Sequence, residues 1–443
     1  MRQANKSGAT SSANDVYVEG AKRNIVARGM KRFEAKKRAP PQPAFEIISP
    51  RIASCLGQNP SDFTLNGTNC YLVGTGDSRI LIDTGDEGYG TEEFVANLRE
   101  CMQTVGCKRI ELIVVTHMHS DHYGNVARLQ DEFGPNVPVA MTTIAFKYQS
   151  MLEVIETQGL VPFLEQGPEF TRGMTDKEFL KLAEKKMPKW PGEDSAEFLS
   201  WDILGRSKIE LQRTYWFMKR AKRFQDACLN GDFPFIELHD GMELNTVGAS
   251  LQVMHTPGHS PGHVALFLLE DADLFSGDTV LGYGTTFFMD LYDYMGSLRK
   301  MLASNPKRLM PGHGPYIEDG AGYISRYILH RDSRENQLVE AMEKFHFPKT
   351  AIQIARLLYV DTPKTKMNFA VQNISKILLK LVKENRVCAY HEMPVAKTTI
   401  SRTTPKRFTF VENLLATLPP LVPPGFKFGG DIFFAMEKKR SFL

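Results

Sequence analysis

The stretch Thr116-His-Met-His-Ser-Asp-His122 packs four potential metal ligands into six residues, directly after a buried-strand pattern. Histidines this close repel each other when charged and compete for hydrogen-bond partners when neutral. A divalent metal ion removes both problems. His117 and His119 alternate by two, so they project to one side of an extended loop. Asp121 and His122 follow on a turn and can face a second metal ion.

Three later segments carry side chains of the same kind. His255-Thr-Pro-Gly-His-Ser-Pro-Gly-His263 places three histidines around two Pro-Gly turns, just before an apolar strand pattern. Ser276-Gly-Asp-Thr279 presents one carboxylate at the end of a short strand, and Pro311-Gly-His-Gly314 adds a histidine. Histidine and aspartate ligands without cysteine suit zinc, manganese or iron, with zinc as the default.

The pattern around these motifs alternates strands and helices. Thr91–Val105 is expected to be a helix with Thr91 as its N-cap. Strands are expected at Asn69–Gly74, Arg79–Thr84, Ile110–Thr116, Val137–Met141, Ala249–His255, Val264–Leu269 and Leu274–Ser276. Strands that alternate with helices, with polar residues at their ends, indicate a layered α/β domain.

The ordered motifs resemble the metallo-β-lactamase superfamily over about residues 45–335, outside a helical, charged insert at 147–233. That superfamily carries HxHxDH, then a histidine after Pro-Gly, a Gly-Asp aspartate and a late histidine. The resemblance implies that the first metal is bound by His117, His119 and His259. It implies that the second is bound by Asp121, His122 and His313, and that Asp278 bridges the two. It also implies that Asp83 supports the ligands from beside the site.

Three further segments are similar to the β-lactamase-like protein 2 family: Asn59–Gly74, Gly282–Tyr294 and Tyr327–Glu335. That family implies a four-layered αββα fold and a mitochondrial endoribonuclease that acts on single-stranded RNA. The insert 147–233 and the long tail 392–443 depart from the family and leave the substrate open.

These ligands predict two Zn²⁺ ions per chain, with Mn²⁺ or Fe as alternatives, and hydrolysis by a hydroxide held between them. Asp121 is expected to accept a hydrogen bond from that hydroxide. His263 has no ligand role in the pattern and is expected either to support the ligands or to supply the leaving group with a proton. His255 matches no ligand position and is interpreted as structural.

Three functions are compatible with this pattern. The favoured one is an endoribonuclease that cleaves single-stranded RNA. The main alternative is a thioester or other acyl hydrolase similar to glyoxalase II, whose ligands fit equally well. A third hypothesis is a non-enzymatic RNA-binding module with a relic metal site, and the intact ligand set argues against it.

Residues 336–391 are expected to form a winged-helix-like domain, whereas the Pro-rich tail 392–443 has no predicted fold. The expected helices are Gln337–Phe345, Thr350–Tyr359 and Asn368–Glu384, followed by a wing at Arg386–His391. Two basic clusters are candidates for guiding RNA, and an ordinary solvated face is the alternative for each. They are Lys376, Lys380 and Lys383 on the third helix, and Lys219, Arg220, Lys222 and Arg223 in the insert.

The composition is that of a globular protein. The chain has 443 residues, 42% hydrophobic and 24% charged, which predicts two or three domains. Its longest apolar runs are far shorter than the roughly 20 residues of a membrane-spanning helix, so no membrane association is expected. Six cysteines without a CxxC pair argue against a disulfide scaffold and favour a reducing, intracellular setting. The net charge of +3 neither demands nor excludes nucleic acid.

Residues 1–44 form a basic segment with ten Lys or Arg and three acidic residues, and without the apolar core of a secretory signal. Two interpretations remain open. A mitochondrial transit peptide would place the protein in the mitochondrial matrix, whereas a solvated basic tail would leave it in the cytoplasm. Asp15 and Glu19 are unusual for a transit peptide. The oligomeric state is not predicted.

Overall fold

The computed structural model describes residues 39–61, 63–143, 223–345, 349–362, 367–390 and 433–436. Within them, one sheet has seven strands in the order β1-β2-β3-β4-β5-β6-β7. These are β1 (Phe45–Ser49), β2 (Ile52–Leu56), β3 (Asn69–Val73), β4 (Ser78–Ile82), β5 (Arg109–Val114), β6 (Val139–Met141) and β7 (Phe235–Glu237). Neighbours are antiparallel from β1 to β4 and parallel from β4 to β7.

A second sheet has five described strands in the order β12-β11-β10-β9-β8. These are β8 (Glu243–Thr246), β9 (Ala249–His255), β10 (Val264–Leu268), β11 (Asp273–Gly277) and β12 (Arg308–Pro311). The β11–β12 pair is parallel and the other pairs are antiparallel. The residues that follow β11 and β12 therefore lie at the same edge of the sheet.

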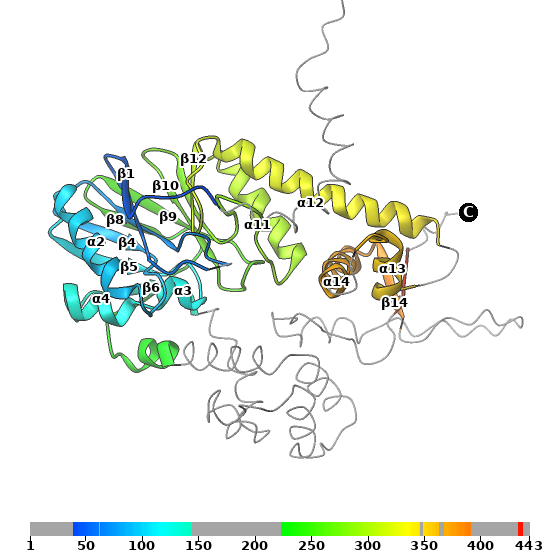
Figure 1. Ribbon diagram of the computed structural model, residues 1–443, viewed down its shortest axis with the longest axis horizontal. Helices are drawn as coiled ribbons and strands as arrows, with labels where there is room; N and C mark the ends of the chain where they lie inside the picture. The colour runs from blue at the N-terminus through cyan, green and yellow to red at the C-terminus, as the bar shows by residue number, and fades with distance from the viewer. Residues whose placement is uncertain are drawn as a thin grey trace, which may run out of the picture. The chain divides into compact units, whose positions relative to one another are not determined.

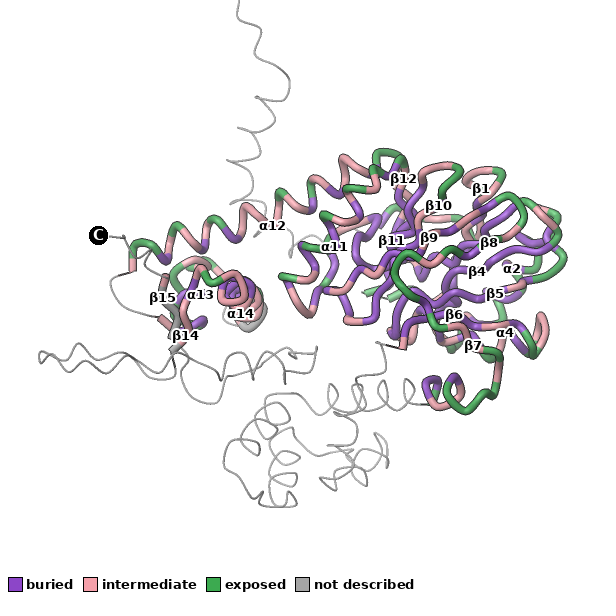
Figure 2. The backbone as a smooth tube through the Cα atoms, turned by 180° about the vertical axis from the view of Figure 1, so that it is seen from behind, coloured by how far each residue is buried: buried purple, intermediate pink, exposed green. Residues whose placement is uncertain are grey.

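The two sheets share an apolar core. Ile82 and Val114 of the first sheet lie in one buried cluster with Val253 and Leu266 of the second. Successive side chains of a strand point to opposite faces, so alternate residues of the same strands belong to other clusters. Because both faces are covered, the central strands β3, β4, β10 and β11 are largely apolar and buried (Figure 2).

Helices cover the outer faces of both sheets (Figure 1). On the first sheet, Leu81 packs with Phe94 and Leu98 of α2, and on the second, Leu274 packs with Tyr294 and Leu298 of α11. The helices of these layers are α2 (Thr91–Thr104), α3 (Ser120–Tyr123), α4 (Val126–Phe133), α11 (Leu291–Ala303) and α12 (Gly320–Glu343). The predicted four-layered αββα fold is confirmed.

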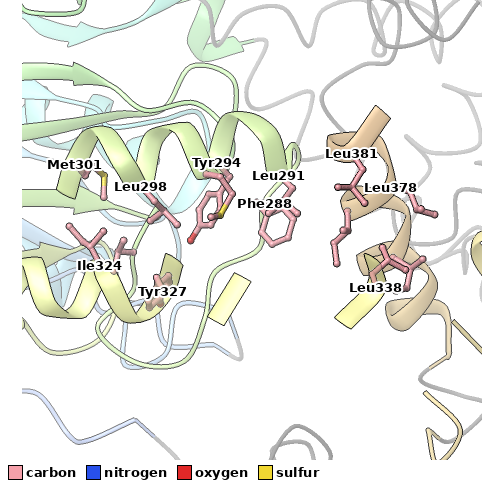
Figure 3. Packing of buried hydrophobic residues seen from close by; sticks show 14 of the residues in the cluster. Phe288, Leu291, Tyr294, Leu298, Met301, Ile324, Tyr327, Leu338, Leu378 and Leu381 are labelled. Carbon is pink, nitrogen blue, oxygen red and sulfur yellow. The ribbon is translucent and has the colours of Figure 1, made fainter. Parts of the chain in front are cut away.

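The C-terminal part contains α13 (Ala351–Leu358), α14 (Met367–Lys383) and a three-stranded sheet of order β13-β15-β14. Its strands are β13 (Lys349–Thr350), β14 (Val387–Tyr390) and β15 (Phe433–Met436). Leu378 and Leu381 of α14 share one apolar cluster with Leu338, Phe288 and Leu291 (Figure 3). The winged-helix assignment stays a prediction.

Three local predictions differ from the structure. Thr91 is the first helical residue and not the N-cap, because its Oγ1 donates to Asn125 Oδ1 (2.9 Å) and accepts from the Gly88 amide (2.9 Å). The expected helix Gln337–Phe345 is the end of the longer α12. The tail 392–443, predicted to have no fold, contributes β15, which pairs with both β13 and β14.

Most of the predicted insert 147–233 lies outside the described residues, which exclude 144–222. Its end, residues 223–230, is helical, and Phe224 stacks on Tyr123 with ring centroids 4.5 Å apart. Among the helices that the structure describes, none combines the length and the hydropathy that crossing a bilayer requires.

Candidate metal centre

The HxHxDH stretch lies at the carboxyl end of β5 and changes conformation along its length. His119 is extended, with φ −75° and ψ 139°, and α3 begins at the next residue. In an extended segment residues i and i+2 share a side, so His117 and His119 point together. Asp121 and His122 lie on the helical turn and join a different group of side chains.

The other predicted ligands follow strands of the second sheet. His259 lies in the loop between β9 and β10, Asp278 directly follows β11, and His313 follows β12. Two glycines allow this close approach. Gly277 has φ +46°, and a Cβ there would lie 2.5 Å from His263 Nε2, while a Cβ at Gly312 would lie 2.5 Å from Asp278 Oδ1. Neither position accommodates a side chain.

Three imidazole nitrogens converge in a first cluster, made of His117, His119, His259 and Asp278. His119 Nδ1 lies 2.8 Å from His117 Nε2 and 3.0 Å from His259 Nε2. Burial lowers the pKa of all three histidines, that of His119 to about 3. At neutral pH the rings are therefore neutral, and the convergence of their nitrogens suits a shared metal ion.

A second cluster contains Asp121, His122 and His313. His313 Nε2 lies 3.1 Å from Asp121 Oδ2. Burial opposes protonation of His122 and His313, but the neighbouring carboxylates outweigh it and raise both pKa values, that of His313 to about 10. In the absence of a metal ion, protons on His122 and His313 would have to balance the negative charge of these carboxylates.

Asp278 lies between the two clusters. Its Oδ1 is 3.6 Å from His122 Nε2 and 3.4 Å from His313 Nε2, whereas its Oδ2 is 3.7 Å from His259 Nε2. Among the described residues, His122 Nε2 and Asp278 Oδ1 are buried polar atoms without a hydrogen-bond partner. Such atoms are costly unless a ligand satisfies them, so the residues present fit two metal ions with Asp278 between them.

Hydrogen bonds outside the clusters fix the orientation of the imidazole rings. Asp83 Oδ2 accepts from His122 Nδ1 (2.7 Å), and Asp83 also accepts from the amide and hydroxyl of Thr116. His259 Nδ1 lies 2.8 Å from the Phe287 carbonyl, and His313 Nδ1 lies 3.2 Å from the Gly67 carbonyl. His122, His259 and His313 thereby keep Nε2 for the centre, the arrangement typical of metal-binding histidines.

The two remaining histidines of the 255–263 segment do not reach the centre. His263 is fully buried, its Nε2 accepts from the Asp278 amide (3.0 Å), and its Nδ1 lies 2.8 Å from Thr256 Oγ1. This geometry suits positioning of Asp278 and does not favour the predicted proton donation. His255 Nε2 contacts the Pro261 carbonyl (2.9 Å), which fits the structural interpretation.

The sequence did not reveal the carbonyls of Phe287 and Gly67, which hold two of the histidines. Any residue supplies a carbonyl, so no residue type marks such a position. The contact of Thr256 with His263 was not predicted either, because a threonine beside a Pro-Gly turn is common.

The lysines of α14, one of the two predicted RNA tracks, all have partners within the protein, and their role in RNA binding stays a prediction. Lys376 Nζ donates to the Phe288 carbonyl (2.5 Å), Lys380 Nζ contacts Glu335 (2.6 Å), and Lys383 Nζ contacts Asp290 (2.6 Å). Lys380 is buried, whereas Lys383 is 26% exposed, so a phosphate would have to compete with these internal partners. Of the other track, Lys219, Arg220 and Lys222 lie outside the described residues.

Comparison with known proteins agrees with this geometry. The Metallo-beta-lactamase superfamily profile matches residues 63–313, which contain all seven predicted ligands. The chain belongs to the metallo-β-lactamase superfamily. It is 31% identical over 342 residues to a Beta-lactamase-like protein 2 homolog of Caenorhabditis elegans, covering 77% of this chain and 88% of that protein. The resemblance predicted from the motifs is confirmed.

Two other relatives are more distant. An atrochrysone carboxyl ACP thioesterase of Paecilomyces divaricatus is 28% identical over 307 residues, which are 69% of each chain. A Beta-lactamase domain protein from Burkholderia ambifaria, of known crystal structure, superposes with a TM-score of 0.54 at 18% identity over 90% of this chain and 97% of that chain. The structural likeness shows the fold alone. The chain is thus a member of a hydrolase superfamily with candidate ligands for two metal ions.

Proposed function

We propose that this chain is a metal-dependent endoribonuclease that cleaves single-stranded RNA, with zinc as the default metal and manganese or iron as alternatives. The observation that carries the proposal is the Asp278 carboxylate, which turns one oxygen toward each ligand cluster. Divalent ions held by these residues would suit displacement at a phosphodiester, because both the attacking and the leaving oxygen carry negative charge.

The protein's own groups have distinct tasks in this proposal. Bound divalent ions would supply charge stabilisation for the phosphodiester and activate water at neutral pH. Asp121 is the more open carboxylate, with a side chain 19% exposed against 10% for Asp278. Despite burial, His122 and His313 keep the pKa of Asp121 low, so its ionised carboxylate can accept a hydrogen bond from the attacking water.

The leaving oxygen of RNA also needs a proton or a positive charge. His263 is a poor source of the proton, because it is fully buried and its Nε2 already accepts from the Asp278 amide. Solvent water at the centre is the remaining donor, and the role of His263 becomes the positioning of Asp278.

A thioester hydrolase is the second candidate. It is favoured by the similarity to the atrochrysone carboxyl ACP thioesterase and by the absence of free lysines on the described part of α14. A thiolate leaves without help from an acid, so the buried His263 would be no obstacle to this reaction.

The test is a substrate panel for the purified, metal-loaded full chain: single-stranded RNA, duplex RNA, single-stranded DNA and acyl thioesters. We expect cleavage of single-stranded RNA at internal positions, lost in Asp121→Asn protein of unchanged fold. Thioester hydrolysis that depends on Asp121, without RNA cleavage, would contradict the endoribonuclease and establish the second candidate.

A further inference from the structure

Two phenylalanines on segments that hold the metal centre expose their rings to solvent. Phe63 is 72% exposed and Phe287 is 62% exposed, yet their ring centroids lie 6.4 Å apart with the planes tilted by 52°. In the other ring pairs among the described residues, at least one ring is buried or half-buried. Exposed apolar side chains that are grouped together are typical of a ligand-binding surface, whereas isolated ones are common.

Both phenylalanines lie on segments whose backbone contacts a ligand of the metal centre, one for each cluster. The Phe287 carbonyl is the partner of His259 Nδ1 at 2.8 Å. Phe63 lies in the turn that leads to Gly67, whose carbonyl is 3.2 Å from His313 Nδ1. The ring pair is therefore carried by two segments that orient His259 and His313.

The residues on either side of Phe287 are held by contacts with other elements. The Thr286 carbonyl accepts from Arg331 (3.2 Å), and the Phe288 carbonyl accepts from Lys376 Nζ (2.5 Å). The Phe288 ring is buried and stacks on Tyr294 at 5.2 Å. With both neighbours fixed, the exposure of Phe287 is a property of the folded segment and not of a loose loop.

The turn that carries Phe63 is fixed in a similar way. Its amide donates to Ser61 Oγ (3.1 Å), which also accepts from the Thr64 amide (3.0 Å). The Thr64 hydroxyl donates to the Asn59 carbonyl (2.5 Å), which closes the turn. Two rings held in place before a ligand arrives lose little conformational entropy when one binds.

We infer that Phe63 and Phe287 form a stacking site for the nucleobase next to the phosphodiester that the centre cleaves. The inference rests on the proposed endoribonuclease function and adds its substrate contact. Every base has a π-face, so stacking on aromatic rings accepts any sequence and requires an unpaired base. The site would thus account for a preference for single strands without the lysines of α14.

The experiment compares a short single-stranded RNA with the same RNA lacking the base on one side of the cleaved bond. We expect loss of the base to lower kcat/KM of the wild type roughly tenfold. In the Phe63→Leu/Phe287→Leu double variant the loss should shrink to less than about twofold, because the base has already lost its stacking partner. Phe63→Trp should retain the wild-type penalty.

Val247→Ala is the matched control, since Val247 is 63% exposed and lies between β8 and β9, at the opposite end of β9 from His259. It should keep the full penalty, and the thermal midpoints of all variants should match the wild type. An unchanged penalty in the double leucine variant would overturn the inference.

A binding arm separates this inference from the proposed function. Asp121→Asn protein is titrated with a single-stranded RNA that carries 2-aminopurine, whose fluorescence falls when it stacks. Quenching that disappears in the double leucine variant supports the site even if the wild type cleaves no RNA. Absence of quenching, or a leucine effect confined to thioesters with aromatic acyl groups, would overturn it.

Discussion

The metal centre and the α14 lysine row (Lys376, Lys380 and Lys383) are both dense groups of ionisable side chains, and they differ in whether their polar atoms have partners. In the centre, His122 Nε2 and Asp278 Oδ1 are buried without hydrogen bonds among the described residues. In the row, each ammonium group contacts a carbonyl or carboxylate within 2.6 Å.

The difference indicates which polar groups are available to bind a ligand. A buried group without a partner lowers stability, so the fold keeps it where a ligand completes it. A fully paired group holds two segments together, as Lys380 of α14 does with Glu335 of α12. In the sequence, the density of charged residues did not distinguish the metal centre from the α14 lysine row. In the structure, their hydrogen-bond partners do.

Asp278→Asn should have the largest effect, because it removes the carboxylate that faces both clusters. Hydrolysis of the identified substrate should fall to the background rate, while the metal-free protein should stay folded, since Asp278 Oδ1 has no hydrogen bond to lose. Steady-state kinetics and thermal unfolding check this. Asp240→Asn, at an exposed pair with Lys300, is the control and should remain active. An active Asp278→Asn enzyme would contradict the role of the centre.

Lys380→Met should act on stability instead. Lys380 and Glu335 are 4% and 6% exposed, and Glu335 keeps Arg386 as a second partner, so loss of the Lys380 contact should cost about 1.5–3 kcal/mol. Denaturant unfolding should show this loss of free energy of unfolding. The Lys380→Met/Glu335→Gln protein should regain part of it. Affinity for single-stranded RNA should stay the same. Weaker RNA binding without lost stability would make the row a binding surface after all.

Asp83→Asn should weaken metal binding at the second cluster. Asp83 has φ +60°, which asparagine tolerates, and its charge acts on His122 through the 2.7 Å hydrogen bond. Loss of such a supporting group lowers metal affinity about 10- to 100-fold. Chelator competition measures it, with Asp240→Asn again as the control. Equal affinity in the two variants would show that Asp83 has no such role.

Lys376 should produce a smaller, pH-dependent effect. Burial, followed by the charge of Arg331, lowers its pKa from 10.5 to about 8. The folded state therefore binds fewer protons between these values, so this residue makes stability rise with pH from about 8 to 10.5. Thermal midpoints across this range should rise less in Lys376→Met protein. Parallel pH profiles for the two proteins would contradict the shift.

The sequence predicted the fold and the candidate ligands that the structure groups into two clusters, because both leave local marks. Apolar runs indicated the buried strands, and the spacing of His117, His119 and Asp121 marked the centre before any contact was known. The resemblance to the superfamily then assigned His259 and His313, which are far apart in the chain, to separate clusters.

Other features depend on distant contacts and left no such mark. The tail pattern could not reveal that β15 pairs with β14, because forty-two residues separate them. The lysines of α14 lie off its apolar stripe, which is typical of a solvated face, but their partners Asp290 and Glu335 come from other segments. Only the folded chain brings these groups together.

The most direct test of the account is anomalous diffraction from crystals of the zinc-loaded full chain. We predict two metal peaks about 3.5–4 Å apart, one beside His117, His119 and His259 and one beside Asp121, His122 and His313. One oxygen of Asp278 should face each peak. A single peak, or two peaks with Asp278 bonded only to protein groups, would contradict the claim that its unpartnered carboxylate joins a two-metal centre.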